Sequence, residues 1–337
     1  MVLVLSDGVP GHDRSSLGVV AALKDRHDLA TNWLRISENK PRSRRMARVA
    51  AALSEPERWL AKGVSLGPNI AADGIGGEGV LHDWPPRADI VVSTGPSTAA
   101  ANIAAARRYG ARNIYCGFPK RPVLGYSLIL SPVPSRSASV ALTARPSEIN
   151  AENLLEPREL ARDEDRTVAV LFGGESKHYS YTAQDMETLA DSLRAVLQDA
   201  ATWECHVYDS RRTNDRTFAA FATAVADEPR IALHRFVDGG LGSNSAAFDA
   251  DAVIVTADSL SMMTEALAAG RPTHVVRAET YRGPPRDQGE IARLSADGLV
   301  ARSTFADFTL EGLMATPTPP RVSRVAELSA LLAQRGF

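Results

Sequence analysis

Short apolar runs rich in Val, Ile and Leu alternate along the chain with helical patterns of hydrophobic positions. In the first half these runs predict strands at residues 2–5, 32–36, 90–93, 113–116 and 127–130, with helices at about 15–25 and 97–109. A second series predicts strands at residues 167–172, 204–208, 231–234, 252–256 and 273–276, with a helix at about 183–197. Such alternation predicts parallel sheets with helices on both faces.

A polar, proline-rich section without clear periodicity separates the two series, at residues 132–165. We therefore expect two Rossmann-like domains, at residues 1–145 and 166–320, with a linker near residues 145–165. The last segment, residues 321–337, is expected to cross back to the first domain. The cleft between the two domains is the expected ligand site.

Composition narrows the function classes. The 337 residues are 44% hydrophobic and carry a net charge of −2, which does not indicate bulk attraction to nucleic acid. The two cysteines, Cys116 and Cys205, show no metal-ligand spacing and fit a reducing cytoplasm. The start of the chain lacks signal-peptide features, and no segment approaches the ~20 apolar residues that span a bilayer.

The most informative segment is VIVTADSLSMMTEALAAGRP, which begins at residue 253 and predicts a buried strand, a polar turn and a helix. Its turn gathers candidate ligand contacts, namely Thr256, Asp258, Ser259 and Ser261. Ligands bind at such junctions in open α/β sheets, and a helix N-terminus suits phosphate. Glu265 is placed to reach a ribose beside that phosphate. Alternatively, the serines only cap the helix, Met262 and Met263 belong to the core, and Glu265 faces solvent.

A glycine turn follows the first strand of the second series, in the sequence FGGESKHY. Glycines expose backbone N–H groups that bind anions, and a hydroxyl and an ammonium group would add to them. The candidate contacts here are Gly173, Gly174, Ser176 and Lys177. His178 and Tyr179 either belong to the site or pack against the sheet.

An arginine-rich turn, DSRRT, follows the next strand. The planar fork of an arginine suits phosphate oxygens, so Ser210, Arg211 and Arg212 are candidate phosphate contacts, with Thr213 as a further donor. The alternative is a helix N-cap at Thr213 or Asn214 beside two solvated arginines. Because the three turns follow strands of one sheet, we expect them to line one pocket.

The first strand leads into SDGVPGH, which offers a candidate catalytic pair. His12 can serve as a general base because its pKa lies near working pH, and Asp7 can orient the imidazole or take the proton itself. The alternative is a loop in which Asp7 caps the helix and His12 is solvated. No DxD triplet stands at a strand end, so we expect no metal.

Five basic residues crowd the start of a helix predicted to run to about Trp59, namely Lys40, Arg42, Arg44, Arg45 and Arg48. Beside the apolar Met46, Val49 and Leu53, they fit either an anionic membrane surface or a solvated helix face. A glycine-rich segment at residues 63–79 is expected to be a loop near the cleft.

These motifs together resemble a family named for a plant mitochondrial fission protein, whose bacterial members are regarded as GT-B glycosyltransferases. FGGESKHY, DSRRT and the segment from residue 253 carry the resemblance in the second half, and SDGVPGH and STGPSTAAA carry it in the first. The chain departs from the family pattern at Val9, at Arg14 and Ser15, and at residues 244–246. Those departures fall where the acceptor or sugar is expected to bind.

The resemblance implies a metal-independent GT-B enzyme that needs no cofactor. The second domain would hold a nucleotide-sugar donor, and the first would hold a hydroxyl acceptor that is a cell-envelope glycan or is lipid-linked. The segment from residue 253 also resembles the donor site of the peptidoglycan N-acetylglucosaminyltransferase. Carried over, Glu265 would bind ribose, Ser259 and Ser261 the diphosphate, and His12 would lie near the acceptor hydroxyl. Two alternatives share the fold or the family name, a nucleotide-sugar 2-epimerase and a non-catalytic scaffold.

Overall fold

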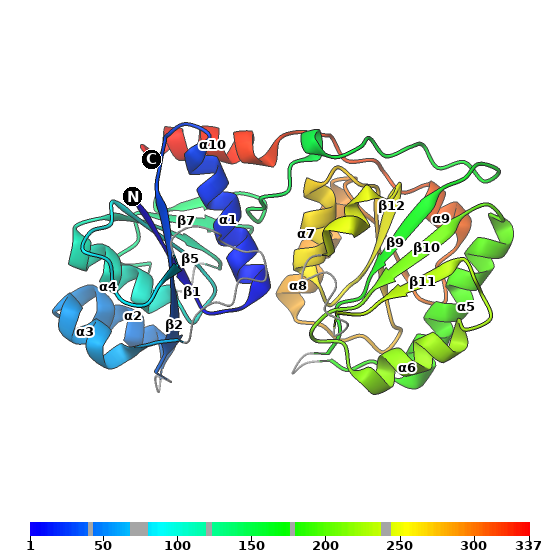
Figure 1. Cartoon of the computed structure of the whole chain (residues 1–337), viewed down its shortest axis with the longest axis horizontal. Coiled ribbons are helices and arrows are strands. Elements are labelled where there is room, and N and C mark those ends of the chain that lie inside the picture. Colours follow the sequence, from blue (N-terminus) through cyan, green and yellow to red (C-terminus); the bar gives the residue numbers. More distant parts are fainter. Residues whose placement is uncertain (40–42, 68–79, 119–122, 176–178, 237–243) are drawn as a thin grey trace. The chain divides into compact units, whose positions relative to one another are not determined.

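The computed structural model describes residues 1–39, 43–67, 80–118, 123–175, 179–236 and 244–337. The chain forms two compact units, one made of Met1–Ile149 with Ser323–Phe337 and the other of Asn150–Val322 (Figure 1). Residues 150–165, expected in the linker, belong to the second unit, where Arg158 pairs with the carboxylate of Asp251 at 2.7 Å. Of the predicted last segment, Ser323–Phe337 belongs to the first unit, and Arg321 and Val322 belong to the second.

The first unit is built on a mainly parallel sheet in the order β3-β2-β1-β5-β6-β7-β8, with β4 also paired to β2. Its strands are β1 (Val2–Ser6), β2 (Thr31–Glu38), β3 (Val64–Leu66), β4 (Val80–Leu81), β5 (Ile90–Thr94), β6 (Arg112–Cys116), β7 (Leu128–Ser131) and β8 (Val140–Leu142). Its helices are α1 (Pro10–Lys24), α2 (Arg44–Leu53), α3 (Pro56–Gly63), α4 (Ala99–Tyr109) and α10 (Arg324–Gln334). Only β3 runs antiparallel to its neighbour.

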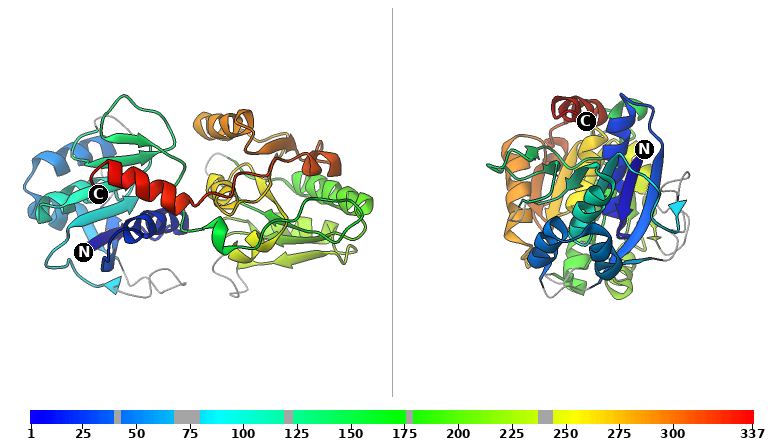
Figure 2. Two further views of the ribbon diagram at one scale, coloured as in Figure 1. Left: turned by 90° about the horizontal axis from the view of Figure 1, so that it is seen from above. Right: turned by 90° about the vertical axis from the view of Figure 1, so that its left-hand side faces the viewer.

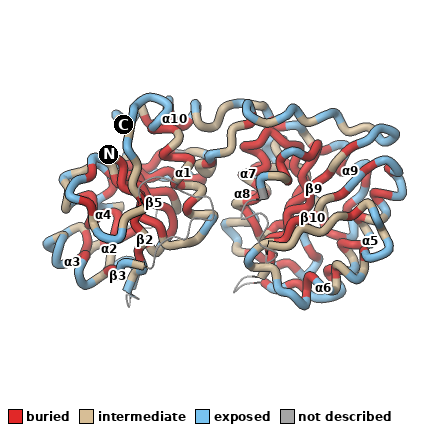
Figure 3. Tube along the Cα trace, in the orientation of Figure 1, coloured by how far each residue is buried: buried red, intermediate tan, exposed pale blue. Residues whose placement is uncertain are grey.

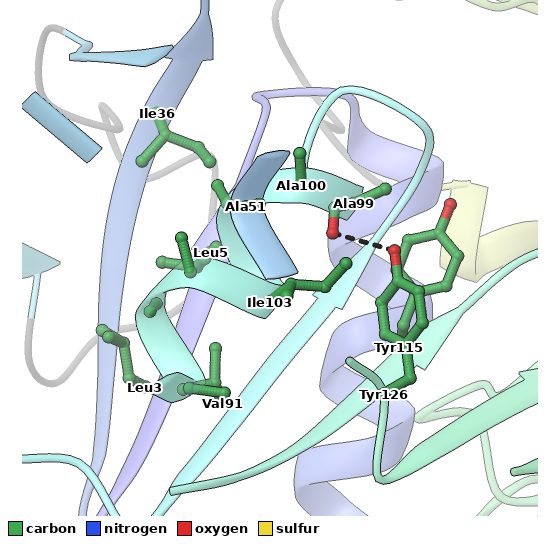
Figure 4. Packing of buried hydrophobic residues seen from close by; sticks show 14 of the residues in the cluster. Leu3, Leu5, Ile36, Ala51, Val91, Ala99, Ala100, Ile103, Tyr115 and Tyr126 are labelled. Atoms are coloured by element: carbon green, nitrogen blue, oxygen red, sulfur yellow. Dashed lines mark hydrogen bonds between the residues drawn. The ribbon is translucent and has the colours of Figure 1, made fainter. Parts of the chain in front are cut away.

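Alternate residues of the strands feed two cores on opposite faces of this sheet. Leu3 and Leu5 of β1 face the core under α2, α3 and α4, where the hydroxyl of Tyr126 donates to the carbonyl of Ala99 at 2.9 Å (Figure 4). Val2 and Val4 face the other core, which is covered by α1 and α10. The last helix, α10, lies beside α1, as the left-hand view of Figure 2 shows.

The second unit has a six-stranded parallel sheet in the order β11-β10-β9-β12-β13-β14. Its strands are β9 (Thr167–Leu171), β10 (Glu204–Tyr208), β11 (Ile231–His234), β12 (Ala252–Thr256), β13 (Thr273–Arg277) and β14 (Ala301–Thr304). Its helices are α5 (Ala183–Asp199), α6 (Asp215–Ala224), α7 (Leu260–Ala268), α8 (Pro285–Ala296) and α9 (Leu310–Met314), with short 3-10 turns at Ala151–Asn153 and Asn244–Asp249. Figure 3 shows its central strands buried and its outer helices partly exposed.

In each sheet, successive strands are first added on one side of a central strand, and later strands are then added on its other side. This change of side lies between β1 and β5 in the first unit and between β9 and β12 in the second. Ligand sites of open α/β sheets lie outside the carboxyl ends of the strands at this point. Both units therefore place a set of polar turns at the position where the fold favours binding.

Candidate functional site

In the second unit, hydrogen bonds through Gly173 join three strand ends. Its N–H donates to the hydroxyl of Thr256, the last residue of β12, at 2.8 Å, and its carbonyl accepts from the hydroxyl of Ser210 after β10. The next residue, Gly174, forms a parallel bridge with Arg212. The structure thus brings together the three turns that the sequence predicted to line one pocket.

The two glycines are required for close approach. A Cβ on Gly173 would lie 2.1 Å from Oδ2 of Asp258, and one on Gly174 would lie 2.4 Å from the carbonyl carbon of Arg212. Gly174 also has a φ of +114°, which side chains with a Cβ rarely adopt. The N–H of Gly173 was expected to face an anion, but it is bonded to Thr256 instead.

Asp258 is a buried carboxylate that holds an arginine. Its side chain is 3% exposed, and Oδ2 accepts from Nη2 of Arg212 at 3.1 Å while Oδ1 accepts from the hydroxyl of Tyr181. Burial raises the pKa of Asp258 above its usual value, although Arg212 and Tyr181 oppose that shift. A carboxylate repels phosphate, so Asp258 is placed to position Arg212. The sequence had instead led us to expect that Asp258 itself would contact the ligand.

The structure distinguishes the two candidate arginines. The guanidinium of Arg212 donates to Asp258 and, at 3.3 Å, to the carbonyl of Glu175. The Arg212 side chain is 36% exposed. A guanidinium has five N–H donors, so these two bonds leave others for a ligand. Arg211 lies exposed in the turn. The predicted N-cap of the following helix is confirmed at Asn214, which accepts from the N–H of Arg216 at 2.9 Å.

The N-terminus of α7 lies directly after the turn that follows β12. Ser259 is its N-cap residue, but the serine side chain makes no capping hydrogen bond. The first intrahelical bond runs from the N–H of Met263 to the carbonyl of Ser259, so the N–H groups of Leu260, Ser261 and Met262 precede the helical ladder. These N–H groups and the positive helix end suit an anion.

Further along α7, the two methionines are buried, as expected for core residues, at 9% and 1% exposed. Glu265 is 5% exposed, so the alternative of a solvent-facing carboxylate is wrong.

Residues 176–178 of the glycine turn, which include the candidates Ser176 and Lys177 and also His178, lie outside the described residues. Tyr179 is buried against two other tyrosines, with its ring centroid 4.8 Å from those of Tyr181 and Tyr281. Tyr181 was not foreseen as part of the site. The only signal for it was a second tyrosine two residues after Tyr179.

In the first unit, Asp7 and His12 form a hydrogen-bonded pair. Nδ1 of His12 lies 3.0 Å from both carboxylate oxygens of Asp7, and the hydroxyl of Ser97 donates to Oδ2 at 2.7 Å. Burial acts to raise the pKa of Asp7, but the bonds from His12 and Ser97 outweigh it and hold the pKa below its usual value. With Nδ1–H donating to Asp7, the neutral imidazole presents Nε2 as a proton acceptor.

The local backbone explains this geometry and corrects the expected loop. The helix α1 already begins at Pro10, so His12 stands in its first turn, and Val9 instead of Asp7 is the N-cap residue. Gly95, in the turn after β5, lies against the imidazole, since a Cβ there would be 2.3 Å from Nδ1. His12 is therefore held by Asp7 and is not merely solvated.

A second carboxyl beside the pair was not predicted. Asp13 is 6% exposed, and burial raises its pKa to about 6. The positive charge of Arg35 opposes this shift. The Arg35 guanidinium lies close to Gly8, where an added Cβ would be only 2.4 Å from Nη2 of Arg35. The only sequence signal was a second Asp directly after His12.

Of the basic residues before and in α2, Lys40 and Arg42 lie outside the described residues, as does most of the predicted glycine-rich loop. Arg44 and Arg45 are exposed and Arg48 is buried. Within the described ranges, no group of three or more His, Cys, Asp or Glu side chains could hold a metal ion. A search of the same ranges finds no helix both long and apolar enough to cross a membrane.

A sequence model of the mitochondrial fission ELM1 family matches residues 10–333. The chain belongs to this family. Among curated proteins, no sequence matches this ELM1-family chain.

Solved structures resemble the ELM1-family chain over nearly its whole length. A proposed UDP-N-acetylglucosamine 2-epimerase from Listeria monocytogenes has a TM-score of 0.57 at 12% identity, covering 98% of this chain and 94% of that one. The UDP-GlcNAc 2-epimerase from Neisseria meningitidis, bound to UDP-GlcNAc, has a TM-score of 0.51 at 11% identity, covering 99% and 98%. At such identities the likeness shows the fold, which is the GT-B architecture of two Rossmann-like domains.

Proposed function

We propose that this ELM1-family protein transfers a sugar from a nucleotide-activated donor to a hydroxyl acceptor, without a metal and with inversion. The observation that carries the proposal is the arrangement in the second unit in which Asp258, in the turn before α7, accepts a hydrogen bond from Arg212 and the first N–H groups of α7 precede the helical hydrogen bonds. A donor diphosphate would bind Arg212 together with Ser259 and Ser261. Glu265 would hold the ribose. That the Neisseria meningitidis relative binds UDP-GlcNAc supports a nucleotide-sugar as the ligand of this site.

The first unit supplies the base in this proposal. Nε2 of His12 takes the proton from the acceptor hydroxyl, whose oxygen attacks the anomeric carbon on the side opposite the phosphate. Asp7 accepts the hydrogen bond of Nδ1–H and stabilises the imidazolium that forms. The bond between the anomeric carbon and the phosphate oxygen breaks, and the nucleoside diphosphate leaves with an added negative charge. Each N–H donor aimed at that charge is worth on the order of 3 kcal/mol.

A thermal-shift screen across nucleotides and sugar nucleotides tests the donor site first. A true donor at 100 times its Kd would stabilise the protein by about 2.7 kcal/mol. Replacing Glu265 with Ala should weaken that effect if the carboxylate holds the ribose. No protection by any nucleotide at millimolar levels would contradict the enzyme proposal and favour a non-catalytic scaffold.

A nucleotide-sugar 2-epimerase is the second candidate, favoured by one observation. An epimerase needs an acid that can exchange a proton near neutral pH, and Asp13 beside the His12 pair has a pKa of about 6. Incubation with UDP-GlcNAc and no acceptor separates the two reactions. Stoichiometric formation of the 2-epimer would overturn sugar transfer, whereas release of UDP only when an acceptor is added would support it.

The acceptor is proposed to be a cell-envelope glycan or a lipid-linked saccharide reached from the cytoplasm. Both cysteines are free and buried, which suits a reducing compartment. Product analysis with lipid-linked and soluble glycan acceptors would separate the two acceptor types.

A further inference from the structure

The helix α2 turns three alanines and one of its three arginines, Arg48, toward the protein. Ala51 packs into the core under α4, and Ala47 and Ala52 lie against that core (Figure 4). On the same side, Arg48 is buried at 8% exposed, and Nε of Arg44 lies 3.8 Å from the buried carboxylate of Glu38. Since surface helices usually place charged residues outward, the burial of Arg48 on this side is uncommon.

The outward side of α2 carries apolar residues. Met46 is 63% exposed and Leu53 is 71% exposed, and the partly exposed Val49 and Ala50 lie between them at helical spacing. We call these four α2 residues the α2 stripe. None of its members belongs to either core of the first unit.

Positive charge surrounds the α2 stripe although the whole chain is slightly acidic. Residues 43–62 contain five basic and two acidic side chains, against a net charge of −2 for the chain. Arg45, Arg58 and Lys62 are exposed on α2 and α3. One of the two acids, Glu57, lies 3.6 Å from Arg108 and is partly neutralised by it.

We propose that the α2 stripe docks on an anionic phospholipid surface, with Met46 and Leu53 inserted at the headgroup boundary and Arg45, Arg58 and Lys62 facing lipid phosphates. An apolar stripe rimmed by basic residues is the composition of interfacial helices. A second copy of the chain fits less well. Ten helical residues form a footprint of about 15 by 10 Å, far below the ~800 Å² per partner of a stable protein interface.

The docking proposal does not depend on sugar transfer. If the protein both docks on lipid and transfers a sugar, docking narrows the classes of acceptor that it can reach. A protein docked on lipid reaches acceptors that are themselves lipid-linked. Because vesicle binding needs no sugar donor, a positive vesicle result without nucleotide-sugar turnover would leave the docking proposal standing and remove the catalytic one.

Co-sedimentation of the full chain with vesicles tests the docking. We expect binding to vesicles that contain phosphatidylglycerol, little binding to pure phosphatidylcholine, and loss of binding at high salt. The double variant Met46→Ser, Leu53→Ser should bind at least about tenfold more weakly, because it removes most of the inserted apolar surface. Arg45→Ala should weaken binding about fivefold, the equivalent of the ~1 kcal/mol that one basic residue contributes at an anionic surface.

Matched controls use exposed residues of the second unit. The control variants are Leu155→Ser, at a residue that is 75% exposed, and Arg216→Ala, at an exposed arginine. Both variants should bind vesicles as strongly as the unaltered protein. Hydrogen exchange on the unaltered protein gives a second readout, since vesicles should protect α2 and leave α6 unchanged. Equal binding to both lipid compositions, or equal loss in the Leu155 control, would overturn the proposal. So would a dimer in solution that the double variant abolishes, because a second copy would then cover the stripe.

Discussion

Replacing Gly173 with Ala tests whether the site of the second unit is assembled around this residue. The added Cβ would lie 2.1 Å from Oδ2, 2.7 Å from Cγ and 2.8 Å from Oδ1 of Asp258, all well inside normal contact distance. The carboxylate cannot move aside cheaply, because Arg212 and Tyr181 hold its two oxygens. Either those bonds break or the end of β9 shifts.

Overpacking of this kind costs about 1–3 kcal/mol. For a unit of this size, that cost corresponds to a fall of roughly 2–12 °C in the unfolding midpoint. The free energy of donor binding should weaken by more than the free energy of unfolding falls, because the displaced carboxylate no longer positions Arg212. Differential scanning calorimetry would give the midpoint, and isothermal titration with the best nucleotide from the screen would give the affinity.

Gly289→Ala is the matched control. Gly289 lies within α8, and a Cβ there meets nothing within 4 Å. Alanine is favoured over glycine inside a helix by up to about 1 kcal/mol, so this variant should melt at the same temperature or higher and bind normally. If Gly173→Ala melted and bound like the control, the close contact between Gly173 and Asp258 would not exist in solution.

Three further predictions address the remaining groups. His12→Ala should lower kcat roughly 10²–10⁴-fold with little change in donor affinity, as measured by initial rates, and an unchanged rate would remove its role as base. Arg212→Ala should weaken nucleotide binding in titration calorimetry much more than Arg211→Ala, because only Arg212 is held in place by Asp258; equal losses would contradict this distinction. Asp13→Asn should raise the unfolding free energy at pH 7 by on the order of 1–3 kcal/mol, as measured by urea denaturation.

The sign of the Asp13 effect follows from its raised pKa. Its pKa is about 6 in the folded protein against a reference of 3.8, so the folded state binds more protons than the unfolded state between these values. The contribution to stability is therefore fully present below about pH 4 and is lost as the pH rises through about 6. Asparagine carries no charge and should remove this dependence, so an unaltered pH profile of stability would refute the assignment.

The hydrophobic pattern predicted the central strands of both sheets because those strands are buried on both faces. All five residues of β1 and of β12 are buried, and each reads as a continuous apolar run. The edge strands β14 and β3 lack this signal. In β14 only Thr304 is buried, and in β3 only Val64, so neither segment stood out from the surrounding loops.

The turns of the site were predictable as strand ends, but the bonds between them were not. Thr256 reaches the N–H of Gly173 because β12 pairs with β9 in a register that matches Val255 with Leu171. That register joins segments far apart in sequence, and it depends on packing of the whole sheet. For the same reason the sequence left Arg211 and Arg212 equivalent, since only the fold shows which one Asp258 holds.

The position of α10 affects how the first unit can be completed during synthesis. Leu328 and Leu332 of this last helix belong to the core that also contains Val19, Val20 and Leu23 of α1. At about 5–20 residues per second, a ribosome needs roughly 10–35 seconds to make the second unit before α10 emerges. During that interval α1 lacks part of its cover, and nascent chains expose an apolar face that chaperones can bind. The second unit, by contrast, is contiguous in sequence and can fold as soon as it leaves the ribosome.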